Sequence, residues 1–155
     1  MEAISKFRLD PKEPTNVDAG SDLLAEDNKS LASLPGIRLC AQYQCDLGYL
    51  IVTDEDCPYE EALHITLLSH DYKRVDSLSL GHIYASGIFK QTTSELPSTL
   101  EFSFFGGDHW RLTFEDPPKP WPIRLMVPGI MRRWRRRFKK HHIHLVRLDG
   151  KTQSR

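Results

Sequence analysis

The side chains of this chain with the most evident capacity for chemistry are cations gathered in one short stretch near the C-terminus. Residues 128–140 have the sequence PGIMRRWRRRFKK. At about 100° per residue on a helix, Ile130, Trp134 and Phe138 share one face and the cations fill the rest. This spacing predicts a basic amphipathic helix over residues 128–140, with Pro128 in its first turn. Its candidate binding residues are Arg132, Arg133, Trp134, Arg135, Arg136, Arg137, Lys139 and Lys140.

The charge of the chain is divided unevenly along its length. Residues 119–155 hold 12 basic and 1 acidic side chains, a balance of +11, whereas residues 1–36 and 37–118 have balances of −3 and −8. A concentrated cationic segment predicts a salt-dependent contact with an anionic partner. That partner is an acidic protein, a second copy of the chain, a nucleic acid or an anionic membrane surface. Docking of the helix on the chain's own acidic body also fits the pattern.

A second charged cluster, of the opposite sign, surrounds Pro58. Carboxylates at this density suit a solvated loop, or an acidic face that meets a basic protein. The alternative function is therefore an inhibitor or immunity-like protein that binds a basic partner through this loop. The calcium spacing of an EF-hand is absent from it. Its members are Asp54, Glu55, Asp56, Glu60 and Glu61.

Three histidines occur where the predicted helix gives way to the last predicted strand. His142 and His144 would project from one face of that strand, which is a spacing that metal sites use. A small metal-dependent enzyme built on these histidines is the remaining alternative. No nucleophile elbow, phosphate loop, dinucleotide fingerprint or paired zinc motif accompanies them. We therefore expect a non-enzymatic module without a cofactor or an evident small-molecule substrate.

The elements that must position these residues are mostly strands, because apolar and polar residues alternate from Ile37 onward. The clearest signal is a β-hairpin in which two alternating runs flank Gly106, Gly107 and Asp108. Residues 116–122 contain four prolines and predict an interruption of the sheet. The predicted strands are 37–43, 47–53, 63–67, 74–80, 81–90, 100–105, 109–114, 123–127 and 143–148.

Together these patterns predict an antiparallel β-sandwich or barrel of about eight strands. A short N-terminal helix is predicted over residues 21–33, capped by Ser21 and ended by Pro35 and Gly36. We expect a flexible tail over residues 1–20, one β-rich domain over residues 21–148, and a second tail over residues 149–155. The first residues lack the apolar core of a signal peptide, and the odd number of cysteines suits reduced thiols. These features predict a cytoplasmic protein.

Overall fold

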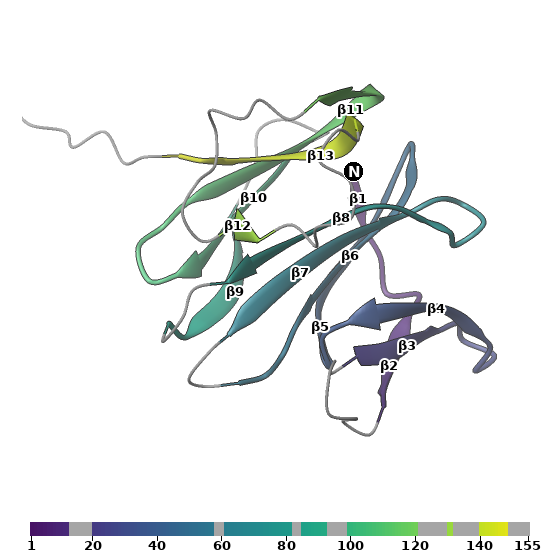
Figure 1. Ribbon diagram of the computed structural model, residues 1–155. Helices are drawn as coiled ribbons and strands as arrows, with labels where there is room; N and C mark the ends of the chain where they lie inside the picture. The colour runs from purple at the N-terminus through teal and green to yellow at the C-terminus, as the bar shows by residue number, and fades with distance from the viewer. Residues whose placement is uncertain are drawn as a thin grey trace, which may run out of the picture.

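The computed structural model describes residues 1–12, 20–57, 61–81, 85–92, 99–120, 130–131 and 140–148. In these ranges the chain forms three antiparallel open sheets and no helix (Figure 1). The six-stranded sheet has the order β1 (Glu2–Ala3), β5 (Arg38–Cys45), β6 (Gly48–Asp54), β7 (Ala62–Leu68), β8 (Arg74–Gly81) and β12 (Ile130–Met131). The four-stranded sheet has the order β13 (Lys140–Arg147), β11 (Trp110–Pro120), β10 (Thr99–Phe105) and β9 (Gly87–Thr92). The three-stranded sheet has the order β2 (Arg8–Pro11), β3 (Gly20–Leu24) and β4 (Ser30–Pro35).

The six-stranded and four-stranded sheets face each other across the main hydrophobic core, as Figure 1 shows. Leu50, Leu63 and Leu78 come from the first sheet, and Phe102 and Leu145 from the second. Their positions follow the period of two that the sequence predicts, since alternate residues of a strand point to one face. The mainly β architecture and the sandwich are therefore confirmed.

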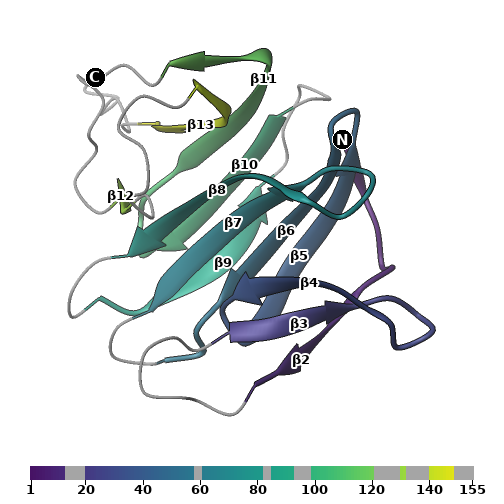
Figure 2. The same ribbon diagram turned by 45° about the vertical axis from the view of Figure 1, so that its right-hand side comes forward.

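A second core lies on the other face of the six-stranded sheet, beneath the three-stranded sheet (Figure 2). It contains Leu23 and Leu34 from the small sheet, Ile51 and Leu68 from the large one, and Phe7. As a result, every residue of β6 is buried. The apolar run of β6 is explained by this position, because a strand covered on both faces has no solvent side to fill with polar residues.

The predicted helix over residues 21–33 is wrong. The chain forms the hairpin of β3 and β4 there, with a turn in which Asn28 adopts a positive φ of 65° and donates its N–H to the carbonyl of Ala25. Leu23 and Leu34 fit one face of a helix. They also fit inward positions of β3 and β4, where both side chains pack on the six-stranded sheet. Tertiary burial outweighed the helical pattern because local propensity contributes little beside packing.

The predicted basic helix over residues 128–140 is wrong at both described ends. Ile130 and Met131 form β12 and pair with Leu80 and Ser79 of β8, and Lys140 is the first residue of β13. Residues 132–139 lie outside the described ranges, and so does the predicted strand 123–127. Regular pairing with an existing sheet edge satisfies backbone groups that the sequence pattern alone assigns to a helix.

The predicted interruption after residue 115 is only local. β11 continues to Pro120, and its register against β13 shifts between Phe114 and Lys119. Among the described residues, β10 pairs only with the beginning of β11, up to Thr113, and the pairing of the proline-rich part is with β13. Such a position tolerates proline, which lacks a donor for a second ladder.

The predicted hairpin around Gly106 and Gly107 is confirmed as the turn between β10 and β11. Gly107 has a φ of 86°, which favours glycine, and Asp108 donates its N–H to the carbonyl of Phe105. The buried carboxylate of Asp108 accepts the N–H of Phe104 and the indole N–H of Trp110. The turn therefore supports itself through one side chain as well as through its backbone.

The first residues, which the sequence assigns to a flexible tail, contribute to two sheets. β1 pairs with β5, β2 pairs with β3, and Phe7 is buried between them. Residues 13–19 of that expected tail and all of the expected tail 149–155 lie outside the described ranges. The described residues include no helix with the length and apolarity that a membrane crossing requires.

Candidate functional site

The cationic candidates lie in a segment whose two neighbours belong to different sheets. We call residues 132–140 the basic segment. Before it, β12 is the outermost strand of the six-stranded sheet, beside β8; at its end, β13 is the outermost strand of the four-stranded sheet, beside β11 (Figure 2). Lys140 has a described backbone, whereas the other candidates of the segment lie outside the described residues. The fold therefore fixes where the basic segment begins and ends.

A largely buried carboxylate joins the two sheets directly after the basic segment. Asp76 of β8 accepts the backbone N–H groups of His142 and Ile143 at its Oδ2, both at 3.0 Å. His141 donates from Nδ1 to the other carboxylate oxygen at 3.1 Å. The side chain of Asp76 is only 9% exposed. Because bonds to a carboxylate are strong when water is excluded, this Asp76 bridge fixes the start of β13 against β8.

We expect Asp76→Ala to lower the free energy of unfolding by about 2–3 kcal/mol, since it removes the acceptor of the backbone N–H groups of Ser77, His142 and Ile143. Chemical denaturation followed by circular dichroism measures this loss. Asp76→Asn keeps one acceptor oxygen and should lose less. The matched control is the exposed Asp10→Ala, with a change within about 0.5 kcal/mol. Equal midpoints for the two alanine variants would contradict the bridge.

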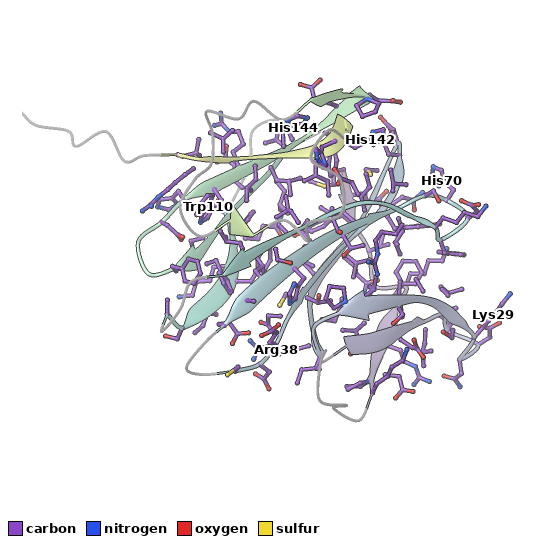
Figure 3. All side chains as sticks on the ribbon, viewed as in Figure 1. Lys29, Arg38, His70, Trp110, His142 and His144 are labelled. Carbon is purple, nitrogen blue, oxygen red and sulfur yellow. The ribbon has the colours of Figure 1, made fainter. Side chains whose placement is uncertain are left out.

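The histidines considered as metal ligands have partners within the chain. His142 donates from Nδ1 to the carbonyl of Glu115, and His144 donates from Nε2 to the carbonyl of His141. Figure 3 shows both near the four-stranded sheet. Across the described part of the chain, no group of three or more His, Cys, Asp or Glu side chains is arranged to hold a metal ion. His142 therefore joins β13 to β11, whereas this bond of His144 lies within β13.

The acidic candidates around Pro58 have diverse environments. Asp54 is 0% exposed and accepts from Arg38 Nε at 2.9 Å, and the exposed Asp56 also pairs with Arg38 (labelled in Figure 3). Glu61 is buried and accepts the backbone N–H groups of Glu55 and Cys57. Glu60 lies outside the described residues. Two of the four described carboxylates are thus committed to the interior, and Asp56 and part of Glu55 face solvent.

Burial controls the ionisation of this end of the sandwich. It raises the pKa of the Glu61 carboxyl, since the charged form loses hydration. The same effect, reinforced by the hydrogen bond to Asp54, raises the pKa of the Cys40 thiol to about 12. A thiol with so high a pKa holds almost no thiolate at neutral pH and is a poor nucleophile or metal ligand. Cys40, Cys45 and Cys57 are free thiols in the structure.

Three side chains that no sequence pattern connects form a polar row across the six-stranded sheet. His64 Nδ1 lies 2.7 Å from Ser79 Oγ, and His64 Nε2 lies 3.2 Å from Glu55 Oε1. The order of groups is that of a serine hydrolase relay. However, the imidazole, which would have to pass its proton to a leaving group, is only 8% exposed. We interpret the row as a satisfied polar network between paired strands.

No protein-family model, curated protein or solved structure matches this chain. Its function must therefore be inferred from charge and geometry. The basic segment is evident from sequence, but Asp76 is not, because its role depends on residues 65 or more positions away. Its only signal is an acidic residue at an inward position of a predicted strand, where apolar residues are the rule.

Proposed function

We propose that the protein is a non-enzymatic binding module that engages an anionic partner through the basic segment. The observation that carries the proposal is the charge density of this segment: seven of the nine residues 132–140 are Arg or Lys. Trp134 and Phe138 are the other two, and they add apolar contact area to the cations. Arginine is suited to carboxylates and phosphates, because its planar fork donates two parallel hydrogen bonds.

The flanking strands support the proposal. Residues 132–139 connect the outermost strands of two sheets, β12 and β13, and the Asp76 bridge holds the second of these strands. Both ends of the basic segment are therefore held at defined places on the molecule.

The charge of the rest of the chain favours a compact partner. Residues 1–118 carry 9 basic and 20 acidic side chains. This excess repels a long polyanion beyond the basic segment, whereas an acidic protein patch needs to meet only the segment itself. An acidic protein surface, on another protein or on a second copy of this chain, is therefore the proposed partner. A nucleic acid and an anionic membrane become outcomes of the test.

The test compares wild type with a variant in which four arginines of the basic segment are replaced by glutamate. The probes are a poly-glutamate peptide, a single-stranded oligonucleotide, and phosphatidylcholine vesicles with and without phosphatidylserine. Sedimentation of the untagged protein follows self-association. We expect wild type to bind the acidic peptide at low salt and the variant to bind at least about tenfold more weakly. The replaced residues are Arg132, Arg133, Arg135 and Arg136.

The matched control changes the net charge by the same amount at exposed positions elsewhere, namely Arg8, Lys29, Lys73 and Lys90. It should keep most of the binding, because the local density of cations is unchanged. Preferred binding of the oligonucleotide or of the anionic vesicles would keep the segment as the site and change the partner class. The proposal would be refuted if the four-arginine variant and the matched control bound every probe with equal affinity at every salt concentration.

A further inference from the structure

A strained segment between β6 and β7 is held by one carboxylate. Glu61 is only 5% exposed, and its Oε1 and Oε2 accept the backbone N–H groups of Glu55 and Cys57, at 2.9 and 3.0 Å. Asp56 lies between these two residues and has a φ of 50°, which is unfavourable for a residue with a side chain. Backbone N–H groups around such a residue can converge on one anion. We call residues 55–57 the held segment.

Glu61 also connects the held segment to both larger sheets. It directly precedes β7, and its own N–H donates to the carbonyl of Ala85 at 3.1 Å. Ala85 lies two residues before β9 of the four-stranded sheet. In Figure 1, β7 and β9 lie close together at this end of the sandwich. A change at Glu61 therefore acts where the two larger sheets approach each other.

Negative charge exceeds positive charge around Glu61. Asp54 is a second buried carboxylate, and Arg38 is the nearby described cation (labelled in Figure 3). Arg38 donates from Nε to Asp54 at 2.9 Å and also pairs with Asp56 of the held segment. Among the described residues, no cation forms an ion pair with Glu61. Glu61 therefore relies on the two N–H groups of the held segment and not on a cation of its own.

Other ionisable groups at this end of the sandwich meet Glu61 less directly. His64 of β7 reaches the held segment through Glu55, with His64 Nε2 3.2 Å from Glu55 Oε1. The thiol of Cys40 in β5 donates to Asp54. Residues 58–60 and 82–84, which adjoin Glu61 and Ala85 in the chain, lie outside the described residues. The described ionisable groups around Glu61 are thus Arg38, Cys40, Asp54, Glu55, Asp56, Cys57 and His64.

Opposing effects set the protonation of Glu61. Burial removes water from its carboxylate and the charge of Asp54 repels it, whereas the two N–H groups and the charge of Arg38 favour the ionised form. Burial and Asp54 prevail and raise the pKa of Glu61 above its ordinary value of 4.5. If the held segment opened, water would reach the carboxyl and restore its ordinary pKa. Opening therefore releases a proton at pH values between the two pKa values, and a rising pH favours it.

We propose that Glu61 is a proton-controlled latch: the held segment closes on its carboxyl when this group takes up a proton, and opens more readily when the proton is lost. A neutral carboxyl keeps a carbonyl oxygen that accepts an N–H, and it no longer bears a charge buried beside Asp54. Closure is therefore tightest below pH 4.5 and weakens as the pH rises through the raised pKa of Glu61. The latch involves no residue of the basic segment, so it does not depend on the proposed function.

The test follows hydrogen exchange of the Glu55 and Cys57 amide protons by NMR between about pH 4 and 7. Division of each rate by that of an unstructured peptide at the same pH yields the opening constant of the held segment. In wild type this constant should be lowest at about pH 4 and rise by up to about tenfold per pH unit, which is the limit for release of one proton. The carboxyl carbon signal of Glu61, titrated in the same samples, should have its midpoint above pH 4.5.

Two glutamine variants assign the effect to one carboxyl. Glu61→Gln imitates the protonated group at every pH, so its opening constant should stay near the wild-type value at low pH. Glu2→Gln makes the same change at an exposed residue of β1 and should keep the wild-type dependence. The proposal is overturned if Glu61 titrates at or below pH 4.5, if the wild-type constant does not rise with pH, or if Glu61→Gln retains the rise, which would assign it to another group such as His64. Circular dichroism verifies the fold of each variant, and the two wild-type measurements decide the outcome if Glu61→Gln does not fold.

Discussion

Replacement of Gly48 by alanine is expected to lower the free energy of unfolding by about 3 kcal/mol or more. Gly48 is the first residue of β6 and has a φ of 132°, which L-residues rarely adopt. A Cβ at this position would lie 2.1 Å from the carbonyl oxygen of Leu68 and 2.7 Å from the carbonyl carbon of Ser69. Both atoms are backbone at the end of β7, so they cannot move without disturbing the β6–β7 ladder.

Two other glycines of the chain separate the causes of this effect. Gly107 has a φ of 86°, but a Cβ added there would meet nothing within 4 Å, so Gly107→Ala should cost only the strain of about 1–2 kcal/mol. Gly106 has neither a positive φ nor a neighbour within 4 Å, so Gly106→Ala should be nearly neutral. Denaturant midpoints of the three variants provide the measurement. A loss at Gly48 no greater than that at Gly107 would show that the close approach to β7 is wrong.

Leu50→Ala and Ile51→Ala are each expected to cost about 2–5 kcal/mol, although these neighbours point to opposite faces of one strand. Leu50 packs in the core between the two larger sheets, and Ile51 packs beneath the three-stranded sheet. In a two-layer sandwich one of the pair would face water and its truncation would matter little. Comparable losses are therefore a specific signature of three layers.

The control for this pair is Ile88→Ala in β9, because Ile88 is 64% exposed. Its change should stay within about 0.5 kcal/mol. The free energy of unfolding should fall with urea concentration at the same slope in all variants. The differences in stability would then arise from the folded state. A negligible loss for Ile51→Ala, beside a large one for Leu50→Ala, would mean that the three-stranded sheet does not cover that face.

Most strands from Ile37 onward could be predicted from sequence, because alternation of apolar and polar residues records which face is buried. The predicted strand 81–90 is wrong in its bounds, since Gly81 ends β8 and β9 begins at Gly87. Leu63, Ile65 and Leu67 alternate in this way and all reach the main core. The hairpin of β3 and β4 could not, since its leucines satisfy a helical period and a strand period together. What decides between them is the apolar face of the six-stranded sheet. That face is assembled from residues later in the chain, such as Ile51 and Leu68.

The charged site was predictable only in part, for a related reason. Cation density is a property of neighbouring residues, so the basic segment is evident from residues 132–140 alone. The contact between Lys6 and Tyr72 joins positions 66 residues apart, and the bridge of Asp76 to Ile143 joins positions 67 apart. No local pattern records such contacts. They follow from the order of strands within the sheets.

The strand that serves two cores also determines how the molecule opens. β6 contributes Leu50 to one core and Ile51 to the other. Separation of either the four-stranded or the three-stranded sheet would therefore expose one face of a strand that remains packed on its other face. The two cores should therefore behave as one cooperative unit, not as two foldons of different stability. Amide protons of β6 would then exchange with solvent only when the whole chain unfolds. Those of β9, which has one neighbour among the described strands of its sheet, can exchange through local opening.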